Sequence, residues 1–183
     1  MVFSKLKAKN IQKEYEKLLK KNREREKSLL PIRSAAILTT EDLSHKFDLQ
    51  EKVSEYLNVR NSRIYSFRNY EKGMLSSYKH FTENDINWQG KVTDVSFKSF
   101  IEHPFDLLIC FFDKSHSYLE YTAAISNAGF KIGFAKVNSD LFEIEISDKT
   151  ENVDAFFGEA KRYLTILNKI SNSEKLNRAS KSV

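Results

Sequence analysis

The chain has 183 residues, 40% of them hydrophobic and 13% aromatic, which is enough for one packed domain rather than a disordered chain. No apolar stretch approaches the roughly 20 residues that cross a bilayer, and the N-terminus lacks the apolar core of a signal peptide, so we expect neither integral membrane association nor secretion. The formal net charge is a modest +5, and the single cysteine, Cys110, has no intrachain partner for a disulfide, which favours a reducing, cytoplasmic location.

The charge is unevenly distributed along the chain. Residues 1–33 carry eleven Lys and Arg against four Glu, a net charge of +7, whereas the other 150 residues carry 19 basic and 21 acidic side chains, a net charge of −2. The basic character therefore belongs to one segment rather than to the whole protein. We predict three parts: a basic helical arm over residues 1–30, an α/β domain over 31–171 and a flexible polar tail over 172–183.

The first predicted element is the helix of this arm. Residues 3–30 contain no Gly or Pro and are rich in good helix formers. Ile11, Tyr15 and Leu18 recur at helical spacing and form a narrow apolar stripe among the lysines. Pro31 is expected to end the helix, because the residue before a proline avoids the α conformation.

The next elements alternate between strand and helix. The apolar run SAAILTT (34–40) predicts a strand, and the spaced apolar residues of 47–57 predict a helix after it. Alternating side chains in RIYSFRNY (63–70) predict a second strand, while YKHFTEND (78–85) fits a third strand less clearly. DVSFKSFIEH (94–103) is typical of a short helix, stopped by the proline that follows it.

The second half of the chain gives stronger patterns. LLICFF (107–112) is a continuous apolar run, typical of a strand covered on both faces. SYLEYTAAISNA (117–128) predicts a helix, in which Ser117 and Glu120 have the spacing of a capping box and Gly129 stands where a helix often ends. Three more elements follow: a strand over 130–137, an edge strand over 142–147 and an amphipathic helix over 153–170.

Strands separated by helices predict an α/β fold with a mostly parallel sheet. Right-handed crossovers then place helices on both faces of that sheet. We therefore expect a single Rossmann-like three-layer sandwich, with the basic N-terminal helical arm added to it.

Four stretches resemble a family of small bacterial proteins of unknown function: INWQGKV (86–92), FDLLICFF (105–112), ISNAGFKIGF (125–134) and YLTILNKI (163–170). This resemblance implies no activity or catalytic residue, because none is established for the family. FDLLI and ISNAGFKIGF also look like the strand–helix–strand unit in the acceptor half of ADP-heptose-type glycosyltransferases. The nucleotide-sugar half of those enzymes has no counterpart here, so their activity is not carried over.

The ends of two predicted strands are candidate sites for a small ligand. Ligands of open parallel sheets bind at the carboxyl ends of the strands, and hydroxyl and backbone N–H groups at a helix start suit an anion. A plainer interpretation is that Ser117 and Glu120 cap a helix, with His116 exposed beside it. We favour that interpretation, partly because Asp113 would repel an anion. The candidate ligand-binding residues are Thr39, Thr40, Ser115, His116 and Ser117.

No catalytic residue is predicted. The five glycines do not match a phosphate-binding loop, and no G-x-S-x-G sequence is present to position a nucleophile. The four histidines lack the spacing of a zinc site, and Cys110 lies inside an apolar strand, where it is more often inert. We therefore expect no metal and no cofactor, and we leave enzymatic activity uncertain, with a non-enzymatic role favoured.

The basic arm gives the leading functional hypothesis, which is docking on RNA or a ribonucleoprotein. Cationic side chains on one helix can neutralise successive phosphates. A solvated helix kept soluble by its lysines is as plausible, and the stripe is narrow for a membrane-surface helix. A homodimer through the helix is a third alternative, and a small-ligand or transferase-like site at the strand ends is another. The candidate polyanion-binding residues are Lys9, Lys13, Lys17, Lys20, Lys21, Arg23 and Arg25.

Overall fold

The computed structural model describes residues 2–75 and 77–171. The predicted flexible tail over 172–183 lies outside the described residues. The helices are α1 (Val2–Glu24), α2 (Glu41–Lys46), α3 (Leu49–Leu57), α4 (Val95–Glu102), α5 (Ser117–Ile125) and α6 (Val153–Ile166), with a short 3₁₀ turn, η1 (Glu83–Asp85). The strands are β1 (Ser34–Thr40), β2 (Asn61–Phe67), β3 (His80–Phe81), β4 (Leu107–Phe111), β5 (Lys131–Phe134) and β6 (Ile144–Ile146).

Within the described residues, six strands form one parallel sheet with the order β3-β2-β1-β4-β5-β6. The chain builds outward from β1 to β3, returns to place β4 on the other side of β1, and then builds outward to β6. The switch point of the sheet therefore lies between β1 and β4, where Ile37 pairs with Ile109. Every residue of β4 is buried, as the continuous apolar run predicts. The predicted Rossmann-like α/β fold is confirmed.

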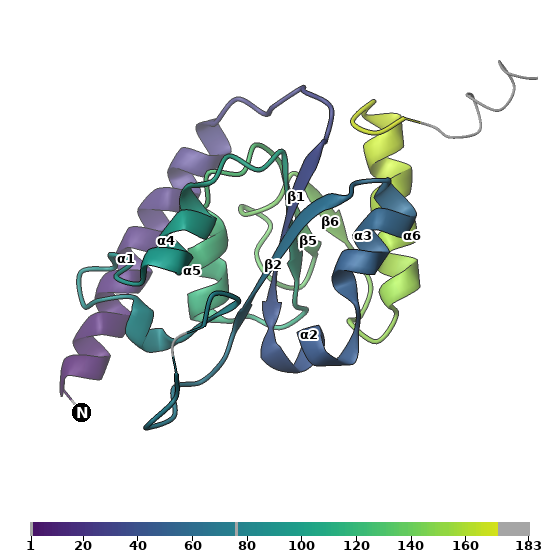
Figure 1. The fold of residues 1–183 in the computed structure, drawn as a ribbon. Coiled ribbons are helices and arrows are strands. Elements are labelled where there is room, and N and C mark those ends of the chain that lie inside the picture. The colour runs from purple at the N-terminus through teal and green to yellow at the C-terminus, as the bar shows by residue number, and fades with distance from the viewer. Residues whose placement is uncertain (1, 76, 172–183) are drawn as a thin grey trace, which may run out of the picture.

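Helices cover both faces of the sheet (Figure 1). α3 and α6 pack together on one face, where Phe156, Phe157 and Val53 are fully buried. α1, α4 and α5 cover the other face, where Tyr65 and Phe97 stack with ring centroids 5.6 Å apart. The hydrophobic core thus consists of two layers separated by the sheet.

The N-terminal helix ends earlier than predicted. α1 stops at Glu24 rather than at Pro31, so the proline does not terminate it. The residue after its end explains the difference, because the Arg25 guanidinium turns toward the body of the protein. It donates to the Ala128 carbonyl oxygen and to the Glu143 carboxylate, at 2.6 Å in each case.

Both ends of α5 also differ from the prediction. His116, rather than Ser117, is the N-cap, because its Nδ1 accepts a hydrogen bond from the Leu119 N–H. The helix ends at Ile125 and not near Gly129, since the backbone at Ser126 is extended. The Gly129 N–H donates to a carbonyl oxygen just before β4 instead of closing the helix.

Gly133 of β5 is a position where a side chain would collide with a buried ring. A Cβ atom placed there would lie 2.6 Å from Cε2 and 2.7 Å from Cε1 of the Phe142 ring. Phe142 is itself nearly buried in the α1–α5 side of the core, so the ring has little room to move. Gly158 in the interior of α6 differs, because nothing lies within 4 Å of its added Cβ.

Replacing these two glycines with alanine should change stability in opposite directions. Gly133→Ala should lower the free energy of unfolding by about 1–3 kcal/mol through overpacking against Phe142. Gly158→Ala should raise it by about 0.5–1 kcal/mol, because alanine is the better helix former. Urea denaturation of both variants measures the difference, and a Gly133→Ala variant as stable as the wild type would contradict the packing described here.

Candidate functional site

The two predicted ligand-binding junctions lie side by side at the switch point between β1 and β4. Thr39 pairs with Phe111 across this junction, and its Oγ1 donates a hydrogen bond of 2.7 Å to the Phe111 carbonyl oxygen. Thr40 is the N-cap of α2, since its Oγ1 accepts a hydrogen bond from the Leu43 N–H. Both threonine hydroxyls therefore already have internal partners: Thr39 links β1 to β4, and Thr40 caps α2.

The second junction surrounds the carboxylate of Glu120, a residue that is only 5% exposed. Its Oε1 accepts hydrogen bonds from the Ser115 hydroxyl at 2.6 Å and from the His116 N–H at 2.8 Å. Its Oε2 accepts a hydrogen bond of 2.7 Å from the Tyr15 hydroxyl on α1. A buried carboxylate needs such donors to offset its lost hydration. Two donors predicted for an external anion thus serve an internal one.

The His116 side chain is half-buried rather than exposed, which corrects the sequence-based expectation. Its ring packs against Phe67 at the end of β2, with ring centroids 4.4 Å apart. Burial lowers the pKa of His116 below its ordinary value, so the neutral ring predominates at pH 7. Ser117 is the first residue of α5 and is exposed beside this ring. Small-ligand binding by these residues stays a prediction.

The basic helix α1 packs against α5 instead of standing apart from the domain. Ile11 and Tyr15 are 3% and 7% exposed, and Leu18 and Leu19 are partly buried in the same cluster. The apolar stripe seen in the sequence is therefore the contact face of α1. A dimer that used this stripe would require α1 to leave α5.

Polar contacts hold α1 to the body along most of its length. They come from Lys7 to Arg23 on the helix and from Arg25 directly after it, and they reach the segments 83–88, 128 and 140–143. Each contact is made to a carbonyl oxygen or a carboxylate. Directional hydrogen bonds therefore hold the helix in place in addition to its apolar contacts with the core. The contacts join Lys7 to the Glu83 carbonyl, Asn10 to the Trp88 carbonyl, Asn22 to the Asp140 carbonyl, Arg23 to the Asp140 carboxylate, and Arg25 to the Ala128 carbonyl and Glu143 carboxylate.

The seven cations predicted to bind a polyanion divide into two groups. Three have carboxylate partners: Lys17 with Glu14, Arg23 with Asp140, and Arg25 with Glu143. The other four are exposed and form no salt bridge within residues 2–75 and 77–171: Lys9, Lys13, Lys20 and Lys21.

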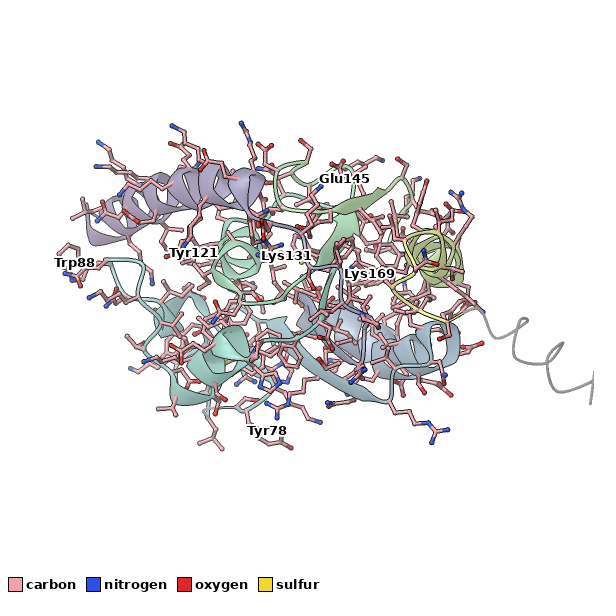
Figure 2. The ribbon with its side chains drawn as sticks, turned by 90° about the horizontal axis from the view of Figure 1, so that it is seen from above. Tyr78, Trp88, Tyr121, Lys131, Glu145 and Lys169 are labelled. Atoms are coloured by element: carbon pink, nitrogen blue, oxygen red, sulfur yellow. The ribbon has the colours of Figure 1, made fainter. Side chains whose placement is uncertain are left out.

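The exposed lysines face away from the body of the protein. At 3.6 residues per turn, Lys9, Lys13 and Lys20 share one face of α1, opposite Ile11 and Tyr15. These three lysines, called the lysine face below, extend over about 16 Å of helix at a rise of 1.5 Å per residue. Nitrogen-tipped side chains project from the outer side of α1 in Figure 2.

The hydrogen bond between Tyr15 and Glu120 could not be found from the sequence. The two residues are 105 positions apart, and Tyr15 looks like an ordinary member of an apolar stripe. In the structure the Tyr15 hydroxyl also accepts a hydrogen bond from Asn138 at 3.0 Å. Burial, followed by the hydrogen bond to Glu120, raises the pKa of Tyr15 far above its ordinary value, so the hydroxyl keeps its proton and donates it.

A second polar cluster, also not predicted, lies at the carboxyl ends of β2 and β3. The Ser66 hydroxyl and the His80 Nδ1 are 2.6 Å apart, and the His45 ring centroid lies 6.4 Å from that of His80. A cavity of about 450 Å³ is lined by both histidines and by Ser66. Ser66 itself is fully buried, which does not suit a nucleophile. The pairing of β3 with β2 creates this cluster, and the sequence pattern does not reveal that pairing.

Lys131 on β5 is a buried cation that the strand pattern conceals. Its Nζ donates a hydrogen bond of 2.7 Å to the Ala123 carbonyl oxygen in the last turn of α5. Burial, and then the nearby positive charge of Arg25, lower the pKa of Lys131 to about 8. Figure 2 shows Lys131 near the centre of the molecule, beside α5. Its amine satisfies a helix-end carbonyl, which is a structural role.

Residues 7–167 match DUF6913, a family of unknown function. The chain belongs to this family. The DUF6913 match begins inside α1 and ends just after α6, so it includes most of the basic helix and the whole sheet. The predicted membership of a family of unknown function is thereby confirmed.

No curated protein and no solved structure matches the chain. The likeness to glycosyltransferases therefore stays a resemblance. No cluster of three or more metal-ligating side chains occurs among the described residues. Within the same residues, no helix has the length and apolar character needed to cross a membrane.

Removing the Tyr15 hydroxyl should destabilise this DUF6913 protein, because the buried Glu120 carboxylate loses a donor. We expect Tyr15→Phe to lower the free energy of unfolding by about 2 kcal/mol, within the range for hydrogen bonds to charged groups. Tyr56→Phe is the matched control, since the Tyr56 hydroxyl binds the exposed Asp154 carboxylate. That change should cost less than about 1 kcal/mol in urea denaturation.

A double-mutant cycle with Glu120→Gln isolates the interaction between the two side chains. Tyr15→Phe should cost less when Glu120 has already been replaced. An equal cost in both backgrounds would show that the hydroxyl and the carboxylate are not coupled.

Proposed function

We propose that this protein is a cytoplasmic, non-enzymatic RNA-docking protein, and that the lysine face of α1 contacts the RNA backbone or the RNA of a ribonucleoprotein. The observation that carries the proposal is the arrangement of Lys9, Lys13 and Lys20 on the exposed side of a helix whose other side is fixed to the body. Lysine ammonium groups bind phosphates as point charges, which suits recognition of a backbone without regard to base sequence.

The rigid attachment of α1 supports this role. Asn10 and Asn22 bind carbonyl oxygens about three turns apart on the helix, and Tyr15 binds Glu120 between them. A surface whose backbone is already ordered loses less conformational entropy when a partner binds. The lysine face therefore offers phosphates a preformed row of charges instead of a flexible tail.

The remaining charges of the helix also support phosphate binding. The cations nearest the body, Arg23 and Arg25, are neutralised by Asp140 and Glu143. Glu16 lies among the outward-facing lysines and accepts a hydrogen bond from Gln12. Three lysines against one glutamate leave this side of α1 positively charged, in agreement with the net charge of +7 over residues 1–33.

The alternative of a small-ligand or transferase-like site has less support. The hydroxyls of Thr39 and Ser115 and the N–H of His116 already form internal hydrogen bonds. An incoming phosphate would have to compete with the Glu120 carboxylate for two of these donors, and its charge would be repelled by that carboxylate. Dimerisation through α1 has less support for a similar reason, because its apolar stripe is occupied by α5.

Reversing the charge of the lysine face should weaken RNA binding in a salt-dependent manner. The variant Lys9→Glu/Lys13→Glu/Lys20→Glu keeps the buried face of α1 intact, whereas deletion of the helix would uncover the core around Ile11 and Tyr15. Binding of a fluorescent single-stranded RNA, followed by anisotropy at several salt concentrations, should show a slope of log K against log[salt] that is smaller by about 2 in the variant.

A control variant carries the same change of charge at exposed lysines on other parts of the protein, Lys72, Lys149 and Lys161. This control should bind RNA with nearly the wild-type slope. The proposal would be wrong if the two variants lost the same affinity, or if the wild-type protein bound no RNA at low salt.

A further inference from the structure

The outer edge of β2 is covered by another strand over only part of its length. β3 pairs with Ser66 and Phe67, the last two of the seven residues of β2. The Ser66 N–H donates to the Lys79 carbonyl oxygen, which identifies the side of β2 that faces β3. Since main-chain groups alternate along a strand, the N–H and C=O groups of Ser62 and Ile64 point to this same side. β3 begins only opposite Ser66, so the main-chain groups of Ser62 and Ile64 have no β3 residue beside them.

A cavity of about 550 Å³ runs along this uncovered edge, and we call it the edge groove. The first two turns of α4 form one wall, and Gln50 of α3 lines the groove as well. The Gln50 side chain already donates a hydrogen bond of 2.8 Å to the Ser62 carbonyl oxygen in the groove. This side-chain amide takes the place that the backbone N–H of a neighbouring strand would occupy. The contact shows that the Ser62 carbonyl oxygen can accept a hydrogen bond from an amide. The lining residues are Gln50, Ser62, Arg63, Ile64, Tyr65, Tyr78, Lys79, Val95, Ser96, Ser99 and Phe100.

The charge of the edge groove defines the kind of partner that fits it. Among the described residues its lining contains two cations, Arg63 and Lys79, and no carboxylate. Both cations are exposed. Two copies of this edge paired with each other would bring like charges together, which disfavours a symmetric dimer here. A segment carrying carboxylates would be attracted instead.

Two apolar side chains at the rim of the edge groove are unusually exposed. Tyr78 is 75% exposed and Val95 is 81% exposed. Large apolar side chains that gather beside unpaired strand backbone are typical of surfaces that bind peptides. Figure 2 shows Tyr78 at the periphery of the molecule, on the side away from α1. A partner in this groove would therefore leave the lysine face free.

We propose that the edge groove binds an extended, acidic segment of a partner protein, which adds to the sheet as a strand along β2. The main chain of the segment hydrogen-bonds to Ile64 and Ser62. Carboxylates of the segment reach Arg63 and Lys79, and its apolar side chains cover Tyr78 and Val95. A nucleic acid strand lacks the alternating N–H and C=O groups that this edge requires.

The test uses the full-length protein and a fluorescein-labelled peptide of sequence Glu-Val-Glu-Val-Glu-Val-Glu-Val, with binding followed by anisotropy. A second peptide replaces each glutamate with lysine. A third keeps the acidic sequence but carries N-methyl groups on alternate backbone amides along one edge, and a fourth carries them on the opposite edge. We expect the acidic peptide to bind, the lysine peptide not to bind, and one N-methylated peptide to bind about tenfold more weakly, because it cannot donate to β2.

Arg63→Glu/Lys79→Glu should weaken binding of the acidic peptide by about tenfold, since both changed side chains are exposed and line the groove. The matched control Lys149→Glu/Lys161→Glu changes the net charge equally at remote positions and should leave the affinity unchanged. Circular dichroism verifies that both variants are folded.

Several outcomes would overturn the proposal. They are the absence of binding by the acidic peptide, undiminished binding by both N-methylated peptides, and an equal loss of affinity in the control variant. Concentration-dependent self-association of the free protein, abolished by Arg63→Glu/Lys79→Glu, would assign the groove to a second copy of the chain instead.

Discussion

The buried carboxylate of Glu120 imposes the constraint on which the arrangement of this protein depends. A carboxyl side chain that is 5% exposed needs hydrogen-bond donors from the groups that surround it. Those donors come from two places, the loop after β4 and the middle of α1. The same carboxylate therefore organises the switch point of the sheet and fixes the basic helix to it. If Tyr15 were absent, the apolar contacts of Ile11 would still bury α1, but Glu120 would lose its link to that helix.

This constraint separates the two kinds of surface that the protein presents. At the switch point, where open α/β sheets usually bind ligands, the available donors are directed inward. On α1 and directly after it, the contacts with the body use Tyr15, the two asparagines and the two arginines, whereas Lys9, Lys13 and Lys20 remain exposed. The proposed RNA contact and the proposed peptide groove thus lie on different sides of the molecule. Neither requires chemistry at the strand ends.

The sequence predicted the elements well wherever periodicity alone decides them. The apolar run 107–112 became the fully buried β4, and the paired glutamates around 143–145 correctly indicated an edge strand, β6. The errors arose where distant contacts decide the outcome. Glu120 was assigned to a local capping box with Ser117, but it accepts hydrogen bonds from Ser115, from the His116 N–H and from Tyr15, which is more than a hundred residues away. Pro31 looked like the end of α1, yet the helix stops at Glu24, before Arg25 turns to Glu143. The edge groove could not be predicted, because the sequence pattern does not reveal that β3 pairs with only two residues of β2.

The central claim is that α1 is an integral part of the folded domain and not a detachable arm. Amide hydrogen exchange of the full-length protein, read by mass spectrometry, tests it most directly. The account predicts that peptides from the middle of α1, around Ile11 to Leu19, are protected to nearly the same degree as peptides from α5. Exchange of α1 at the rate of an unstructured peptide, with α5 still protected, would contradict it.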